Sequence, residues 1–233
     1  GCWSMSNSSS TLSRYEIKFV TESFHYHNIL NWLNQHNSYL KIEYPDRQVN
    51  NIYFDSYSHN SYCENIYGSS IKSKVRFRWY GSSEEPKIGS LEIKCKRNQL
   101  NRKLIYKIQE DIQKNGGNWK SIQSEIQRQV PAEGKKWMDM NPLPVLINRY
   151  KRKYLITRDK KVRVTLDSNL KLYDQSRKPF PNYLLKSNLP EVIVMEIKFP
   201  KNLRDYVVQT FRDVPMRSSR FSKYVAGVLS ING

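Results

Sequence analysis

The clearest pattern in the sequence is an alternation of charged and apolar residues in KVRFRWYG, at positions 74–81. Lysine and arginine occupy one set of alternate positions, and valine, phenylalanine and tryptophan occupy the other. Because successive side chains on a β-strand point to opposite faces, this stretch predicts a strand with one cationic and one apolar face.

Strand-like stretches of this kind recur along the chain, separated by turn signals rich in Gly, Asn, Asp and Pro. The expected strands cover residues 14–20, 49–55, 74–80, 90–96, 104–109, 148–156, 161–167 and 192–199. Helical patterns interrupt them, and the expected helices cover residues 21–35, 118–129, 204–212 and 221–229. The Pro-bearing segment 131–144 is expected to be an irregular loop between two halves of the sheet system.

The chain shows no repeat of fixed period and no linker long enough to separate domains. We therefore expect one β-rich domain with accessory helices over residues 13–233. The first residues, GCWSMSNSSS, do not look like part of that fold. We expect a disordered tail or a cloning scar over residues 1–12.

Several strands repeat the cationic face, and three of them have a single Glu two residues before a Lys. Same-face neighbours are about 6.7 Å apart, so two like charges repel by roughly 2.5 kcal/mol at an effective dielectric near 20. Five or six such faces cannot form a dry core, since unpaired charges carry a heavy desolvation cost. For one strand, a solvent-exposed face is the simpler interpretation. For many strands dominated by Arg and Lys, a wet cavity that holds an anion is favoured.

Such a cavity forms when a sheet of about eight strands closes on itself. The apolar faces then point outward and need amphipathic helices to cover them. The predicted fold is α+β and β-rich: an eight-stranded antiparallel β-barrel coated by accessory helices, with Phe77 and Trp79 packed beneath helices.

Composition indicates which kinds of ligand this cavity could bind. The 233 residues carry a formal net charge of +18, which favours a polyanionic partner. Nucleic acid, an anionic membrane surface, a phosphorylated small molecule and an inorganic polyanion all fit that charge. No apolar run approaches the roughly 18 residues of a membrane helix. The three cysteines lack a CxxC pair, so zinc is not expected. The same cysteine pattern favours a reducing, cytoplasmic location.

A series of motifs also resembles a known family. RYEIKF, NIYFDS, KVRFRWYG, LEIKCK, the segment from Tyr150-x-Arg152 to Arg163–Asp167, MEIKF and RFSKY follow one another in that order. Together they resemble the VTC domain, the polyphosphate polymerase domain of the vacuolar transporter chaperone complex. That family is placed among the triphosphate tunnel metalloenzymes, with the CYTH phosphatases. The resemblance implies an eight-stranded tunnel that binds a triphosphate and a metal ion. It also implies transfer of the γ-phosphate of ATP to a growing polyphosphate chain, with release of ADP.

The resemblance also implies roles for individual residues. The cations expected to stabilise the transferred phosphoryl group are Lys18, Arg76, Arg78, Lys94, Arg152, Arg163 and Lys198. Further substrate contacts are expected from Lys103, Tyr150, Arg220 and Lys223. Mn²⁺ or Mg²⁺ is expected at Glu196, and Glu16 and Glu92 are expected either to support the metal or to pair with Lys and Arg. Asp167 is expected to tether tunnel cations, and Asp55 to cap a helix that begins near residue 56.

The chain departs from the CYTH pattern at two carboxylates. Arg14 and Val194 stand where CYTH enzymes usually have Glu, which weakens a two-metal hydrolase interpretation. A metal-dependent inorganic or nucleoside triphosphatase of the same fold remains the alternative. A polyphosphate- or RNA-binding module is a weaker one, because KVRFRWYG lacks the internal glycines of the RNA-binding RNP1 motif.

The expected partners are ATP and inorganic polyphosphate, with no specific nucleic acid and no membrane span. The sequence leaves open whether the protein has a membrane partner. The tunnel is expected to be open at both ends, so that a growing chain can leave.

Overall fold

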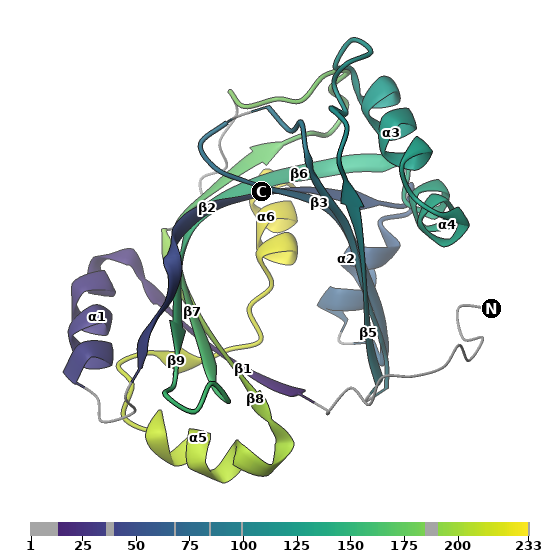
Figure 1. Cartoon of the computed structure of the whole chain (residues 1–233). Coiled ribbons are helices and arrows are strands. Elements are labelled where there is room, and N and C mark those ends of the chain that lie inside the picture. Colours follow the sequence, from purple (N-terminus) through teal and green to yellow (C-terminus); the bar gives the residue numbers. More distant parts are fainter. Residues whose placement is uncertain are drawn as a thin grey trace.

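The computed structural model describes residues 14–35, 40–67, 69–83, 85–98, 100–184 and 191–232. Its centre is one sheet of nine strands in the order β5-β4-β3-β2-β6-β7-β8-β1-β9. All neighbouring strands are antiparallel. The strands are β1 (Arg14–Glu22), β2 (Lys41–Asp55), β3 (Ile71–Tyr80), β4 (Gly89–Arg97), β5 (Leu100–Ile108), β6 (Leu143–Ile156), β7 (Arg163–Asp174), β8 (Val192–Pro200) and β9 (Arg217–Ser218). The sheet curves strongly, so that it has a concave and a convex side (Figure 1).

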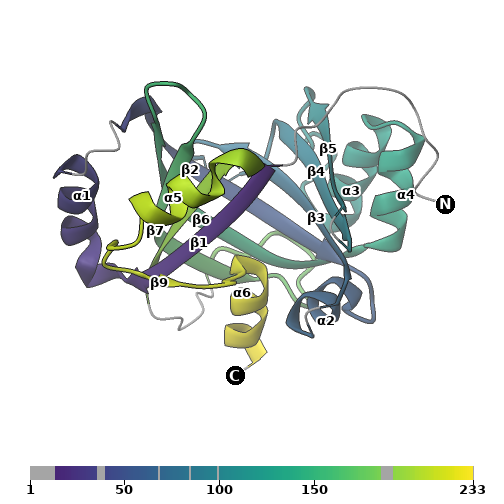
Figure 2. The ribbon, with the colours of Figure 1, turned by 90° about the horizontal axis from the view of Figure 1, so that it is seen from below.

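The helices are α1 (Tyr26–Gln35), α2 (Asn60–Ile66), α3 (Trp119–Arg128), α4 (Ala132–Met140), α5 (Arg204–Thr210) and α6 (Lys223–Asn232). Helices α1, α3, α4 and α5 lie on the convex side, whereas α6 lies inside the curve and α2 lies near α6 at one end of the sheet (Figures 1 and 2). Short 3-10 helices, Ser23–His25 and Lys201–Leu203, precede α1 and α5. None of the helices in the described part of the chain is long and apolar enough to cross a membrane.

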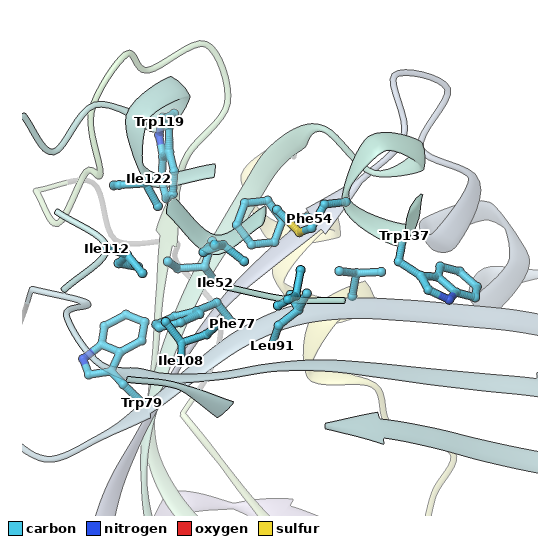
Figure 3. Close-up of a cluster of buried hydrophobic side chains, with 14 of the residues drawn as sticks. Ile52, Phe54, Phe77, Trp79, Leu91, Ile108, Ile112, Trp119, Ile122 and Trp137 are labelled. Carbon is cyan, nitrogen blue, oxygen red and sulfur yellow. The ribbon is translucent and has the colours of Figure 1, made fainter. Parts of the chain in front are cut away.

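The apolar faces of the strands pack beneath these helices, as expected. Phe77 and Trp79 of β3 are buried in one cluster with Trp119 and Ile122 of α3 and Trp137 of α4 (Figure 3). A second cluster joins β7 and β8 to α1 and α5. Strands β3 and β4 thus bury their apolar positions on the convex side, which leaves the alternate charged positions on the concave side.

The predicted barrel does not close. In the described residues, β5 is hydrogen-bonded to β4 alone, and β1 pairs with β8 and with the two residues of β9. The sheet therefore has a seam between the edge at β5 and β4 and the edge at β1. Side chains rather than backbone groups approach across this seam, where Lys94 of β4 lies 3.9 Å from Glu16 of β1.

The expected loop at 131–144 was wrong, because it contains α4. Pro131 is the N-cap of this helix, and Pro142 and Pro144 follow its last residue. Proline is tolerated at a helix start and common after its end, so these residues flank the helix rather than interrupt it. Helix α4 is held in place by the burial of Gly134, Trp137 and Met138. This burial depends on tertiary packing, which the local sequence does not show.

The expected helix at 21–35 was too long. Thr21 and Glu22 belong to β1, where they pair with Ile193 and Val192 of β8. The α-helix begins only at Tyr26. Backbone hydrogen bonds to β8 therefore extend the strand past the polar residues that resemble a helix start.

Helix α6 lies against the concave side of the sheet. Its Tyr224 and Val228 are buried with Tyr53 of β2, Leu146 of β6 and Leu172 of β7. Gly227 permits this approach, since a Cβ atom there would lie 2.4 Å from Cδ2 of Leu146. Helix α6 therefore occupies part of the concave side, along which a tunnel open at both ends was expected.

Asp55, at the end of β2, anchors both α2 and α6. Its carboxylate accepts hydrogen bonds from the backbone amides of Ser61 (2.9 Å) and Tyr62 (3.0 Å) in the first turn of α2. It also accepts one from the Tyr224 hydroxyl at 2.5 Å. Asp55 caps a helix, as expected, although that helix begins at Asn60 rather than near residue 56.

Candidate anion-binding tunnel

Charged side chains converge on the concave side because the register aligns their alternate positions. Arg76 lies opposite Glu92, Arg152 opposite Asp167, and Lys18 opposite Glu196. Arg163 lies opposite Lys198. One charged surface thus receives side chains from β3, β4 and β5 and from β6, β7, β8 and β1. This surface, which we call the cationic tunnel, comprises Glu16, Lys18, Lys74, Arg76, Arg78, Glu92, Lys94, Lys103, Tyr150, Arg152, Arg163, Asp167, Glu196, Lys198 and Lys223.

Glu92 organises the cations of β3 and β5. One of its oxygens accepts hydrogen bonds from Nε and Nη2 of Arg76 at 2.8 and 2.6 Å. The same oxygen lies 4.0 Å from Arg78 and 3.7 Å from Lys103. Burial raises the pKa of Glu92, but Arg76, Arg78 and Lys103 outweigh burial and lower it to about 2. Glu92 is thus an ionised tether for three cations.

Arg78 and Tyr150 are both buried and are hydrogen-bonded to each other. Nε of Arg78 donates to Oδ1 of Asn51 at 2.7 Å, and Nη2 donates to the Tyr150 hydroxyl at 3.0 Å. Burial raises the pKa of Tyr150, but Arg78, Arg152 and Lys223 outweigh burial and lower it to about 8. The Tyr150 hydroxyl can therefore donate a hydrogen bond and is more acidic than an ordinary phenol.

Asp167 joins β6 and β7 to the C-terminal helix. Its two oxygens accept hydrogen bonds from Nε and Nη2 of Arg152 at 2.7 and 2.9 Å. Lys223, the first residue of α6, donates to the same carboxylate at 2.8 Å. Burial raises the pKa of Asp167, but Lys223 and Arg152 outweigh burial and lower it. The expectation that Asp167 tethers tunnel cations agrees with these bonds.

Strands β1 and β8 place two Glu-x-Lys motifs side by side in opposite directions. Glu16 lies opposite Lys198, and Lys18 lies opposite Glu196. Within the motifs, Lys18 lies 3.3 Å from Glu16 and Lys198 lies 3.0 Å from Glu196. The same register brings Glu16 and Glu196 to diagonal positions on neighbouring strands. Burial raises the pKa of Glu196, but Lys198, Lys18 and Lys223 outweigh burial and lower it well below its usual range.

Glu16 and Glu196 are the candidate ligands for a divalent cation, because they pair with lysines whereas Glu92 and Asp167 are held by arginines. In the described ranges, no group of three His, Cys, Asp or Glu residues lies close enough to hold a metal. Glu16, Glu92 and Glu196 therefore do not form one ligand set, and Glu92 is already engaged by Arg76. A pair of carboxylates does suit Mg²⁺ or Mn²⁺, because such ions are often held by one or two carboxylates plus substrate phosphates. The residues present fit a metal that binds together with a phosphate ligand.

The remaining expected residues lie at the rim of the tunnel. The side chains of Lys94, Lys103, Arg163 and Lys198 are 56%, 46%, 48% and 48% exposed, which leaves them accessible to a ligand. Arg163 also pairs with Glu43 of β2 at 3.2 Å. Arg220 is different: its side chain is exposed between β9 and α6. In the part of the chain that the structure describes, Arg220 does not join the ion pairs of the other predicted residues.

Lys74 is a tunnel residue that the resemblance did not include. Its Nζ donates to the hydroxyl of Ser222, just before α6, at 3.1 Å. Burial lowers the pKa of Lys74 to about 7, with further contributions from Lys18, Lys94 and Arg76. The signal was present in the alternation of KVRFRWYG, where Lys74 shares the positions of Arg76 and Arg78.

A separate cavity of about 260 Å³ lies on the convex side, between α2, α4 and the ends of β3 and β4. Ser61, Cys95, Trp137 and Met140 contribute to its lining. This cavity is therefore behind the sheet from the cationic tunnel and does not belong to it.

The family is shown by a direct match. The family model of the VTC domain matches residues 13–232, nearly the whole chain. No curated protein sequence matches this chain.

Solved structures of similar fold include two proteins with low sequence identity. One is a putative adenylyl cyclase from Hippeastrum, described as having a dominant triphosphatase activity. It is 14% identical at a TM-score of 0.55, over 90% of this chain and 92% of that chain. The other, a putative adenylate cyclase from Vibrio parahaemolyticus, is 10% identical at a TM-score of 0.50, over 91% of this chain and 96% of that chain. Identities this low support a common fold and no more. With an open triphosphate-tunnel fold and a family match over nearly its whole length, the chain belongs to the VTC domain family.

Proposed function

We propose that this protein is a polyphosphate polymerase, which transfers the γ-phosphate of ATP to a growing inorganic polyphosphate chain and releases ADP. The observation that carries this proposal is the cationic tunnel, in which lysines and arginines from seven strands and α6 outnumber the carboxylates. A linear polyanion suits such a surface, because its charges repeat along its length as the cations do.

The chemistry asks the protein for positioning and charge stabilisation. The transition state of phosphoryl transfer spreads negative charge over the oxygens of the transferred group. Arg76 and Arg152 are held in fixed orientations by Glu92 and Asp167, so their remaining N–H groups are preorganised for phosphate oxygens. Lys94 and Lys198, at the rim, supply mobile point charges. A divalent cation at Glu16 and Glu196 would neutralise further charge on the bound phosphates.

The carboxylates of the tunnel favour transfer to a phosphate over hydrolysis. Glu92 and Asp167 are tied to arginines and lysines, and their lowered pKa values make them weak bases. An attacking water needs a base, whereas the terminal phosphate of a polyphosphate chain is already an anion. The same surface would therefore serve a phosphate acceptor better than a water.

A metal-dependent triphosphatase is the second candidate, and one observation favours it. Helix α6 occupies part of the concave side, which restricts the path of a long product at that end. The triphosphatase activity attributed to the Hippeastrum protein of similar fold points the same way. Under either activity, we propose ATP or inorganic polyphosphate as ligand and the cytoplasm as location.

One assay separates the two activities. The protein is incubated with ATP and Mn²⁺ or Mg²⁺, and ADP, free phosphate and acid-stable polymer are followed together. A polymerase forms ADP and polymer with little free phosphate. A triphosphatase releases free phosphate and forms no polymer. If no ATP is consumed with either metal, the protein is a binding module rather than an enzyme.

A further inference from the structure

Lys74 sits where the two edges of the open sheet face each other. It lies directly opposite Lys94 in the ladder between β3 and β4. Lys18 approaches from β1, on the other side of the seam, and donates to the backbone carbonyl of Phe221 at 3.5 Å. The Lys74 ammonium itself bonds to the Ser222 hydroxyl at 3.1 Å. Three lysines from three strands thus meet beside the segment that leads into α6.

This cluster has too little negative charge of its own. The groups that act on Lys74 are Glu16 and Lys18 from β1, Lys94 from β4 and Arg76 from its own strand. Glu16 is the one carboxylate among these groups, and it is shared with Lys18 at 3.3 Å and Lys94 at 3.9 Å. Glu196 also acts on Lys18 and Lys94, but it is paired with Lys198 at 3.0 Å. The direct partner of Lys74 is a neutral hydroxyl. Mutual repulsion of the ammonium groups is therefore only partly compensated within the protein.

We propose that Lys74, with Lys18 and Lys94, forms a phosphate subsite across the seam, and that Lys74 takes up a proton when the anion binds. This inference rests on the proposed function, since it assumes that a polyphosphate-like anion enters the tunnel. It goes further by naming a residue and a proton that the resemblance to the family does not supply. Lys74 thereby makes anion binding depend on pH.

The direction of the pH effect follows from the charge of Lys74. Burial and the neighbouring cations lower the pKa of Lys74 to about 7 in the free protein, so the side chain is mostly neutral at pH 8 and charged at pH 6. A bound phosphate favours the ammonium form and raises that pKa. Binding above pH 7 must then take up a proton, whereas binding well below pH 7 need not. Affinity for the anion consequently falls as the pH rises, by up to about tenfold per pH unit.

The test is calorimetry with inorganic tripolyphosphate in the absence of metal. Titrations at pH 6 and pH 8, each in two buffers of different ionisation enthalpy, give the number of protons taken up. K74R keeps a positive charge at both pH values, so it removes the proposed proton uptake while retaining the cation. K74Q removes the cation altogether. Tyr150 and the ligand also titrate in this range, but they are the same in the wild type and in K74R and cancel in the comparison.

The expected result is that the wild type takes up close to one more proton than K74R at pH 8, and little more at pH 6. Between pH 7 and pH 8 the wild type should lose up to about tenfold more affinity than K74R. K74Q should bind weakly at both pH values. The exposed Lys87, in the loop between β3 and β4, supplies the control K87R, which should behave as the wild type does.

Two failures can be told apart. Equal proton uptake and equal pH dependence in the wild type and K74R, with intact binding, would overturn the role of Lys74 and leave the proposed function in place. Absence of tripolyphosphate binding by the wild type would overturn both. Circular dichroism and thermal melting of each variant establish that it is folded, and a K74R that does not fold moves the comparison to K74Q. In K74Q, proton uptake at pH 8 equal to that of the wild type overturns the proposal.

Discussion

The Arg152 guanidinium donates two hydrogen bonds, of 2.7 and 2.9 Å, to the buried Asp167 carboxylate. These bonds join the neighbouring strands β6 and β7. Lys223 adds a third bond from α6 at 2.8 Å. One buried carboxylate therefore holds together the sheet and the helix that lies inside it. This arrangement orients cations for a ligand and also stabilises the fold.

Replacing Asp167 with Asn should destabilise the protein by about 3–5 kcal/mol, because it leaves two cations buried without a counter-charge. Urea unfolding at pH 7 measures the change. The matched control is Asp213→Asn, where the side chain is 79% exposed and lies 3.5 Å from Arg212. That control should change the free energy of unfolding by less than about 0.5 kcal/mol. Equal losses in both variants would contradict the role given to Asp167.

Glu92 should make stability depend on acid pH. Its pKa is lowered from 4.5 to about 2 in the folded protein, so its ionised form stabilises the fold above the unfolded pKa. That contribution, on the order of 3 kcal/mol, is lost as the pH falls from about 4.5 towards 2. The free energies of unfolding of wild type and Glu92→Gln should accordingly differ at pH 7, and the difference should shrink below about pH 4.5 and become small only as the pH approaches 2. In the exposed control Glu85→Gln, no such pH-dependent difference is expected.

Glu196→Gln should separate metal use from anion binding. With a divalent metal and ATP, we expect turnover to fall by about 10- to 100-fold and the half-saturating metal concentration to rise. Without metal, tripolyphosphate binding should persist, because the substitution removes a negative charge from a cationic surface. Glu133→Gln, on the outer side where Glu133 pairs with Arg102, is the charge-matched control and should leave turnover unchanged. A Glu196→Gln variant with the metal dependence of the wild type would remove Glu196 from the metal site.

Gly227→Ala should disturb the contact between α6 and the concave side. The added methyl group would lie 2.4 Å from Cδ2 of Leu146, a side chain with no exposed surface. We expect a loss of about 1–3 kcal/mol from overpacking. The double variant Gly227→Ala/Leu146→Ala makes room for the methyl group, so its loss should be smaller than the sum of the single losses. Additive losses in urea unfolding would show that the two residues do not compete for space.

Much of the candidate site could be predicted because strand alternation is a local property. All eight expected strands are strands, and the register of the sheet brings the predicted site residues of β3, β4, β6 and β7 to the concave side. Lys74 and Arg76 of β3 illustrate this, since two-residue spacing alone places them on one face. The motif order also predicted the VTC family, which the match over residues 13–232 confirms.

Ion-pair partners could not be predicted, because they depend on which strands become neighbours. Glu92 was expected either to support a metal or to pair with Lys and Arg, and the pairing of β3 with β4 places it against Arg76. Lys223 lies 56 residues from Asp167, and only the return of α6 into the curve brings them together.

By itself, the sequence determined which segments are strands, which faces are cationic and which family the chain belongs to. These properties follow from side-chain period and from the order of short motifs. Only the tertiary structure decided that the sheet stays open, that α4 replaces a loop and that α6 enters the concave side. Closure and helix docking depend on distances between edges and on close contacts such as Gly227 with Leu146, which arise from residues far apart in the chain.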